Sequence, residues 1–527
     1  MTRVLMIICV AMLLRATVTA DDTVNYQTQV RQVLQQRCFA CHGVLKQESG
    51  LRLDTTASAI RGGDTGAAIV PGDSTASELL RRISATELSE RMPPEGEALK
   101  PAEIAAIRRW IDQGAKAPVD EVPESDPREH WSFKPPVRPA VPSPESQISD
   151  QQFQIRTPID AFIAATHQQH GLIPQPEADK RTWLRRVSID LIGLPPTREE
   201  QEEFLADGSS SAHDKVVTRL LDSPHYGERW GRHWMDIWRY SDWWGLGAEV
   251  RNSQKHIWHW RDWIIESLNA DKGYDQMLRE MLAADELYPN DLDRLRASGF
   301  LARQYFKFNR TSWLDETVEH TAKSMLGLTF NCAKCHDHKY DPFSQVEYYQ
   351  MRAFFEPYQI RTDVLPGETD LEKDGLPRAF DCNLEPLTYV HVRGDDRNPD
   401  QSRALSAVVP AFLEFDNFPV ELVQLPMEAS QPHLRAHVVD SYVKAAEAEV
   451  AAAVADAAQH PSNPLPLEFH LAELALERAD LNLAAVNARA AADREKSGSP
   501  DSADALSLAF VAARAERLLA AAKAEET

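Results

Sequence analysis

Two short stretches repeat one spacing of cysteine and histidine at widely separated points in the chain. The first is RCFACHG at residues 37–43, and the second is NCAKCHDHKYDP at residues 331–342. In each, two cysteines are three positions apart and a histidine directly follows the second cysteine. Of the six cysteines in the chain, four lie in these two units. A pattern this restricted is not expected twice by chance, so the two units predict a shared chemistry.

The spacing places two thiols on one helical turn, where they can form thioether bonds to both vinyl groups of a haem. The following histidine then reaches the iron from one side. In the first unit, Cys38 and Cys41 are the predicted attachment residues and His42 is the predicted proximal ligand. Met92 follows in a loop with two prolines and is the predicted sixth ligand, which would raise the reduction potential of the iron. A methionine that only fills the core is the alternative.

In the second unit, Cys332 and Cys335 are the predicted attachment residues and His336 is the predicted proximal ligand of a second haem c. A zinc site or a thioredoxin-like redox pair is the alternative, and both are disfavoured by the predicted export and the trailing histidine. No methionine loop follows this unit. His338 is too close in sequence to His336 to reach the opposite face of the same iron.

Four other histidines were weighed as the missing sixth ligand of the second unit: His233, His256, His259 and His320. His320 lies on the predicted helix upstream of the second unit, and the other three lie in the predicted aromatic helices. Histidines in such positions more often form structural hydrogen bonds than bind a metal. The sequence therefore predicts no particular sixth ligand for the second unit.

The first twenty residues have the composition of a secretory signal peptide. Arg3 precedes an apolar run at residues 4–14, and small residues end the segment at Ala20. The run is too short for a membrane span, and no later segment resembles one. We therefore expect an exported protein without a transmembrane segment, located in the periplasm or at the cell surface.

Acidic residues outnumber basic ones, with 80 Asp and Glu against 57 Lys and Arg and a net charge of −23. Such a surface repels nucleic acid and anionic lipid, so we expect no nucleic-acid partner. The acids are spread along the chain, which is typical of a solvated exterior.

Periodicity and turn residues predict a mainly α protein with several parts. After the signal peptide (1–20), residues 24–116 form a small cytochrome c-like helical domain, and residues 117–150 form a proline-rich linker. Residues 155–360 form a larger helical domain that contains the second unit. Residues 361–432 mix loops with a short strand at LTYVHVRG, and residues 433–527 form an alanine-rich helical hairpin or coiled coil.

The larger helical domain is rich in tryptophan, with eight of the twelve tryptophans at residues 230–263. Trp230, Trp234 and Trp238 recur every four residues with Ile237 beside them, which predicts one apolar helical face. Packing in a core is the favoured interpretation, and a sugar-stacking platform is the alternative.

Charged residues beside these motifs have two interpretations. Asp236, Arg239, Asp242, Asp315 and Glu316 either take part in catalysis or form buried ion pairs that brace a helical core, and the second is favoured. No nucleophile elbow, phosphate-binding loop or HExxH zinc motif is present.

Several of these motifs also occur in a fixed order that resembles a known family. CFACHG, LRLDT, AIVPGD, SELLRRI, RMPP and EIAAIRRWIDQGA, within residues 26–116, resemble the planctomycete-type cytochrome c domain. RRVSIDLIGLPPT, YGERWGRHWMDIWRYSD and CAKCHDHKYDPFSQVEYY, within residues 155–360, resemble the domain of unknown function that accompanies it. The resemblance implies a haem c domain in which Cys38, Cys41, His42 and Met92 carry over by position. Such proteins usually continue into a further C-terminal domain, which we expect this chain to lack.

Three hypotheses of function follow. The leading one is an exported c-type cytochrome that binds haem c and transfers electrons to an unidentified redox partner. The second is a haem-dependent oxidoreductase or peroxidase-like enzyme that uses the second unit. The third is a cell-surface binding or structural protein whose tryptophan face and C-terminal helices hold a glycan or a protein partner.

Overall fold

The computed structural model describes residues 23–94, 96–143, 155–242, 255–303, 309–383, 385–413, 423–459, 466–498 and 503–526. The predicted signal peptide lies outside them. The chain divides into two compact units. Unit 1 comprises Met1–Arg138, Cys335–Val346 and Pro410–Phe415, and unit 2 comprises Pro139–Lys334, Glu347–Val409 and Asp416–Thr527. The predicted mainly α fold class is confirmed.

The N-terminal part of unit 1 packs short helices around one apolar core. These are the π turn Tyr26–Val30, α2 (Arg31–Arg37), α3 (Phe39–His42), α4 (Thr56–Arg61), α5 (Glu78–Ser84) and α6 (Pro101–Asp112). Ile107, Trp110 and Ile111 of α6 are all buried in this core. The ring of Tyr26 stacks on Trp110 with 5.2 Å between the ring centres. The core therefore contains residues from both the beginning and the end of this N-terminal region.

The first part of unit 2 is a series of helices whose ends follow local signals in the sequence. They are α7 (Pro158–Gln169), α8 (Lys180–Ile192), α9 (Arg198–Ala206), α10 (Ala212–Leu221), α11 (Pro224–Trp238), α13 (Trp258–Asn269), α14 (Tyr274–Leu287), α15 (Leu292–Leu295), α16 (Gly299–Ala302), α17 (Arg310–Thr321) and α18 (Gln345–Ala353). Thr157 and Thr197 cap α7 and α9 in reciprocal capping boxes. Gly193 ends α8 in the left-handed conformation.

The tryptophan face is only partly buried. Trp238 is fully buried and its ring stacks on Trp234 at 4.9 Å, whereas Trp230 and Trp234 are half-buried. Ile237 was predicted on this face, but it is 47% exposed. Core packing is therefore confirmed for Trp238 alone. Two tryptophans of α13 are also buried, namely Trp260 and Trp263.

One antiparallel hairpin follows α18 in unit 2. Strands β1 (Tyr358–Asp363) and β2 (Leu376–Asp381) pair so that Tyr358 lies opposite Asp381. The strand predicted at LTYVHVRG does not form. Thr388 and His391 make only isolated bridges there, and the 3₁₀ turn Val392–Gly394 follows. These bridges, to Leu405 and Pro399, involve single residues, so they do not make the continuous ladder of a strand.

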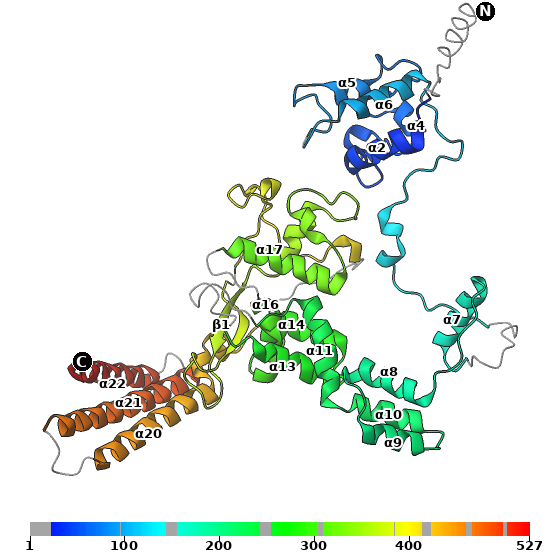
Figure 1. Cartoon of the computed structure of the whole chain (residues 1–527). Helices are drawn as coiled ribbons and strands as arrows, with labels where there is room; N and C mark the ends of the chain where they lie inside the picture. Colours follow the sequence, from blue (N-terminus) through cyan, green and yellow to red (C-terminus); the bar gives the residue numbers. More distant parts are fainter. Residues whose placement is uncertain are drawn as a thin grey trace, which may run out of the picture. The chain divides into compact units, whose positions relative to one another are not determined.

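The C-terminal part of unit 2 consists of α19 (Met427–Ser430), α20 (Ala436–Gln459), α21 (Pro466–Gly498) and α22 (Ala503–Glu526). The helix α21 packs against α20 and against α22, so the three long helices run side by side (Figure 1). This agrees with the helical hairpin expected from the alanine-rich sequence. Within the described residues, no helix is long and apolar enough to cross a membrane.

Close packing of α11 on α13 generates a first prediction. A Cβ at Gly227 would lie 2.4 Å from the Ile265 carbonyl oxygen and 2.7 Å from the Asn269 side chain. Gly227→Ala should lower the free energy of unfolding by about 1–2 kcal/mol, because overpacking outweighs the gain of about 1 kcal/mol in helix propensity. Urea denaturation measures the change.

The control is Gly208→Ala, where an added Cβ would meet no atom within 4 Å. This variant should keep the wild-type stability or exceed it slightly. Equal stabilities for the two variants would contradict the packing argument.

Candidate functional site

The first CxxCH unit forms one compact turn between α2 and α3. The Cys38 amide donates to the Leu34 carbonyl at 2.8 Å, and the Cys38 carbonyl accepts from the Cys41 amide at 3.1 Å and the His42 amide at 2.9 Å. Cys38 is buried within the core, whereas Cys41 is exposed. Burial raises the pKa of the Cys38 thiol to about 12, so it stays protonated at neutral pH. The backbone therefore holds both thiols and His42 on one turn.

The His42 imidazole is half-buried next to this turn. Burial lowers its pKa, and the backbone of Leu51 offsets part of the shift. Its Nδ1 is buried and forms no hydrogen bond within the described part of the chain. A neutral imidazole with no competing partner on a ring nitrogen is suited to metal ligation.

Met92 packs against the same apolar core as Cys38. Its amide donates to the Arg82 carbonyl at 3.0 Å. The neighbouring Arg91 side chain holds the loop by donating to the Pro93 carbonyl at 3.2 Å and the Gly96 carbonyl at 2.8 Å. The fold thus fixes Met92 at the core that contains the attachment turn. This placement suits both the predicted ligand and a core-filling methionine.

These residues fit a covalently bound haem. The unit combines a buried thiol and an exposed thiol on one turn, a neutral imidazole with an orphaned ring nitrogen, and a thioether at the same core. Sulfur and nitrogen donors of this kind are the usual protein ligands in c-type haem sites.

The second CxxCH unit has a different local structure. Cys332 lies in the 3₁₀ turn Phe330–Lys334 rather than on an α-helix. Cys332, Cys335 and His336 are all exposed. The His336 Nδ1 donates to the Asp337 carbonyl at 2.7 Å, which leaves Nε2 as the nitrogen for a metal. No three His, Cys, Asp or Glu side chains of the described residues converge as a metal site requires, so the zinc interpretation finds no support in geometry.

Lys334 lies between the two cysteines of the second CxxCH motif, and a polar cluster holds it in place. Its Nζ lies 2.7 Å from Asp315 Oδ2, and its carbonyl accepts from Tyr349 Oη at 3.1 Å. Asp315 Oδ1 also accepts from Tyr348 Oη at 3.0 Å and from Arg352 Nη1 at 2.9 Å. Asp315 therefore braces the core as predicted, by joining α17 to α18 and to the segment of the cysteines.

Sequence reasoning missed His391 near this cluster. Its ring lies 5.0 Å from the Tyr349 ring. Burial and then the Arg352 charge lower its pKa, and the Lys334 charge adds to the shift. His391 is therefore a neutral imidazole in the neighbourhood of the second CxxCH motif. It lies in the segment predicted as a strand, so no spacing linked it to the cysteines.

The candidate histidines for the sixth ligand of the second CxxCH motif lie in different environments. The His256 Nε2 donates to the Leu371 carbonyl at 2.9 Å, and the His259 Nε2 lies 2.8 Å from Asp374. His338 Nδ1 accepts the Asp341 amide at 2.8 Å. His233 is exposed beside Trp230, and His320 is buried. The interpretation as structural hydrogen-bonded histidines is thus confirmed for His256 and His259.

The other acidic residues proposed as buried braces are in fact at the surface. Asp236 is exposed and pairs with the exposed Arg232 one turn earlier on α11. Asp242 is exposed and accepts a hydrogen bond from Tyr240, and Glu316 is exposed as well. The prediction of buried ion pairs was therefore wrong for these positions. Asp236 and Glu316 lie on the solvent side of α11 and α17, and Asp242 lies after the end of α11, which charge alone did not indicate.

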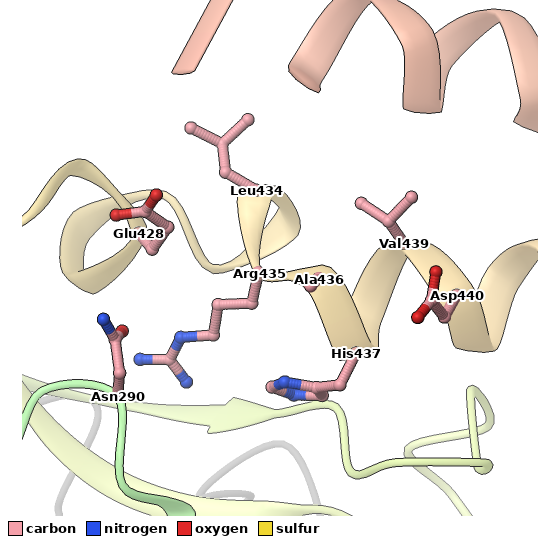
Figure 2. A pocket seen from close by; sticks show the side chains of 8 residues that line it. All are labelled: Asn290, Glu428, Leu434, Arg435, Ala436, His437, Val439 and Asp440. Carbon is pink, nitrogen blue, oxygen red and sulfur yellow. The ribbon is translucent and has the colours of Figure 1, made fainter. Parts of the chain in front are cut away.

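A cavity of about 580 Å³ lies in unit 2 where α20 begins (Figure 2). Arg435 and His437 line it, together with Asn290, Glu428, Leu434, Ala436, Val439 and Asp440. The Arg435 guanidinium is held by Asp363 at 2.8 Å and by the Pro289 carbonyl at 2.9 Å. The His437 Nε2 donates to the Val364 carbonyl at 3.1 Å. Hydrogen bonds within the protein thus hold the side chains of Arg435 and His437 in the cavity wall.

Comparison with known families now identifies the two regions. The Planctomycete cytochrome C model matches residues 38–96, and the model of a protein of unknown function (DUF1549) matches residues 158–360. The chain therefore contains a region similar to planctomycete cytochrome c, followed by a region similar to DUF1549. This is the arrangement that the sequence resemblance implied. No curated protein and no solved structure matches the chain.

The two matches include both CxxCH units. Cys38, Cys41, His42 and Met92 all lie within the planctomycete cytochrome c match, and the family implies haem c. The second CxxCH motif and Asp315, which braces it, lie within the DUF1549 match.

The brace at Asp315 generates a second prediction. Asp315→Ala removes the carboxylate that Arg352 and Lys334 share, and it leaves Arg352 with only Glu356 at 3.0 Å. Because Arg352 is almost fully buried, we expect the free energy of unfolding to fall by about 2–4 kcal/mol in urea denaturation.

Asp236→Ala is the control, because it breaks an exposed ion pair with Arg232 in the same unit. Its loss should be below about 0.5 kcal/mol. Similar losses in the two variants would show that the Asp315 cluster is not a buried brace.

Proposed function

We propose that this chain is an exported c-type cytochrome that binds haem c and transfers electrons. The observation that carries the proposal is the first CxxCH turn, which lies at the core of a region that matches the planctomycete cytochrome c family. When bound, haem c supplies a one-electron iron couple. Domains of this family are typically exported, in agreement with the N-terminal segment.

The residues of the first domain have distinct parts in this function. Cys38 and Cys41 anchor the macrocycle, and the neutral His42 is the proximal ligand. Met92 is the sixth ligand, and its soft sulfur favours the reduced iron. The apolar core around Cys38 excludes water, which keeps the environment of the redox centre rigid and of low polarity.

A second haem c is proposed on Cys332, Cys335 and His336. The two thiols are exposed and therefore accessible to an attachment reaction. The contacts of Lys334 with Asp315 and Tyr349 fix the backbone between them. The second CxxCH motif thus has a fixed attachment segment, although it lacks the apolar core that surrounds the first motif.

Haem stoichiometry gives the third prediction. Denatured, solvent-extracted wild-type protein should retain two haems per chain by pyridine haemochrome, because thioether bonds survive unfolding. The double variants Cys38→Ala/Cys41→Ala and Cys332→Ala/Cys335→Ala should each retain one. Met92→Ala should retain both and change only the spectrum of the first haem.

Two outcomes decide against this proposal. Wild-type protein that loses all haem absorbance on extraction would exclude covalent haem altogether. A wild-type value of one haem, unchanged in the Cys332→Ala/Cys335→Ala variant, would limit the haem to the first domain. Cys382→Ala is the matched control, because Cys382 is exposed and lies outside both units.

A second candidate function is a haem-dependent oxidoreductase that uses the second unit. The observation that favours it is the presence of His391 in the neighbourhood of Lys334. A neutral imidazole is a group that can move a proton at a substrate.

This candidate function gives the fourth prediction. One haem of the wild-type protein should change its spectrum on addition of peroxide, and His391→Ala should slow that reaction by about 10²–10⁴-fold, the usual contribution of an acid–base residue. Stopped-flow absorbance measures the rate. His233→Ala is the control, because His233 is exposed and lies in unit 2 of the fold, as His391 does. Low-spin spectra for both haems with no response to peroxide or cyanide would exclude the oxidoreductase.

A further inference from the structure

One arginine of the DUF1549 domain is buried without a carboxylate. Arg303 directly follows α16 in unit 2, and its side chain is 95% buried. Its Nη1 donates to the Phe300 carbonyl, and its guanidinium carbon lies 4.0 Å from the centre of the Phe300 ring. The other two nitrogens, Nε and Nη2, are buried and have no hydrogen-bond partner among the described residues.

The unpartnered nitrogens form the edge of the guanidinium that usually binds an oxyanion. The Nε–H and one Nη2–H bond are parallel and match two oxygens of a carboxylate, phosphate or sulfate. This chain uses the same edge elsewhere. Arg81 binds Glu78 through Nε at 2.7 Å and Nη2 at 2.6 Å, and Arg128 binds Asp126 at 3.0 and 2.6 Å. In Arg303 this edge is preformed, because Nη1 already holds the side chain in place.

The other buried arginines of the described residues all have a carboxylate. Arg378 and Arg435 bind Asp363 at 2.6 and 2.8 Å, and Arg352 binds Asp315 at 2.9 Å. Burying a charged group without a partner is costly, so folds rarely leave one in that state. Arg303 is the exception among these four.

Charged groups of both signs act on Arg303. Arg239 ends α11 in a left-handed conformation with φ of 62°, and it is exposed. Burial lowers the pKa of His320 to about 4, and the charges of Arg303 and Arg239 add to the shift, so His320 is neutral at neutral pH. Burial lowers the pKa of Arg303 to about 9, while Tyr358 and Glu316 oppose the shift, so the guanidinium stays charged.

We propose that Arg303 is the centre of an oxyanion-binding site in the DUF1549 domain. The ligand presents two oxygens of a carboxylate, phosphate or sulfate to the Nε/Nη2 edge of Arg303. Arg239 is exposed, and its positive charge attracts the ligand. The site lies outside both CxxCH units, so it does not depend on the proposed electron transfer.

The experiment is thermal unfolding of the full chain with increasing phosphate, sulfate or acetate, at an ionic strength held constant with sodium chloride. A ligand that binds the folded state raises the melting temperature with a saturable dependence on its concentration. We expect at least one of the three anions to do so in the wild type. A response to acetate alone indicates a carboxylate ligand, and a response to phosphate or sulfate indicates a tetrahedral one.

Two variants and a control locate the site. Arg303→Met keeps the length of the side chain and should abolish the saturable response. Arg239→Ala, at an exposed position, should weaken the apparent affinity several-fold. Arg232→Ala is the control, because Arg232 is also exposed on α11 and pairs with Asp236. It should keep the wild-type affinity.

Three results would overturn the proposal. The first is a wild-type melting temperature that responds to all three anions no more than to chloride. The second is an unchanged saturable response in Arg303→Met. The third is an equal loss of affinity in Arg239→Ala and Arg232→Ala, which would assign the effect to general surface charge. If Arg303→Met does not fold, the comparison of Arg239→Ala with Arg232→Ala still decides.

Discussion

Unit 2 depends on one buried carboxylate, Asp363, at the end of β1. Its oxygens bind Arg361 at 2.6 Å, Arg378 at 2.6 Å and Arg435 at 2.8 Å. These arginines come from β1, from β2 and from the residue before α20, so a single side chain joins the hairpin to the C-terminal helices. The Arg charges keep the pKa of Asp363 below its usual value although burial opposes this. Loss of that carboxylate would leave buried guanidinium groups without their anion.

Features that depend on neighbouring residues could be predicted from the sequence. The ends of α7, α8 and α9 follow from capping residues and from Gly193, and these signals act within one helical turn. The hairpin could not be predicted in this way, because β1 and β2 are defined by pairing with each other. LTYVHVRG has the alternation of a strand but pairs only through isolated bridges, and Ile237 has the spacing of the tryptophan face but is exposed.

The same distinction applies to the candidate sites. Cys38, Cys41, His42 and the corresponding second unit could be predicted because haem attachment is written in consecutive residues. His391 and Arg303 could not, because their roles depend on burial by elements distant in sequence. His391 is brought to Tyr349 by the fold, and Arg303 matters only because its Nε/Nη2 edge is buried without a carboxylate. Charge and residue type gave no indication of either environment.

The two regions bury different charged groups. The first has an apolar core around Cys38 and also buries Asp54, which pairs with Arg52.

The region that matches DUF1549 buries Arg303, Arg352 and Arg378. Arg352 pairs with Asp315, and Arg378 pairs with Asp363. Arg303 has no hydrogen-bonded carboxylate among the described residues. Burial of an unmatched charge is costly, so the proposed oxyanion would supply the negative charge that this position lacks.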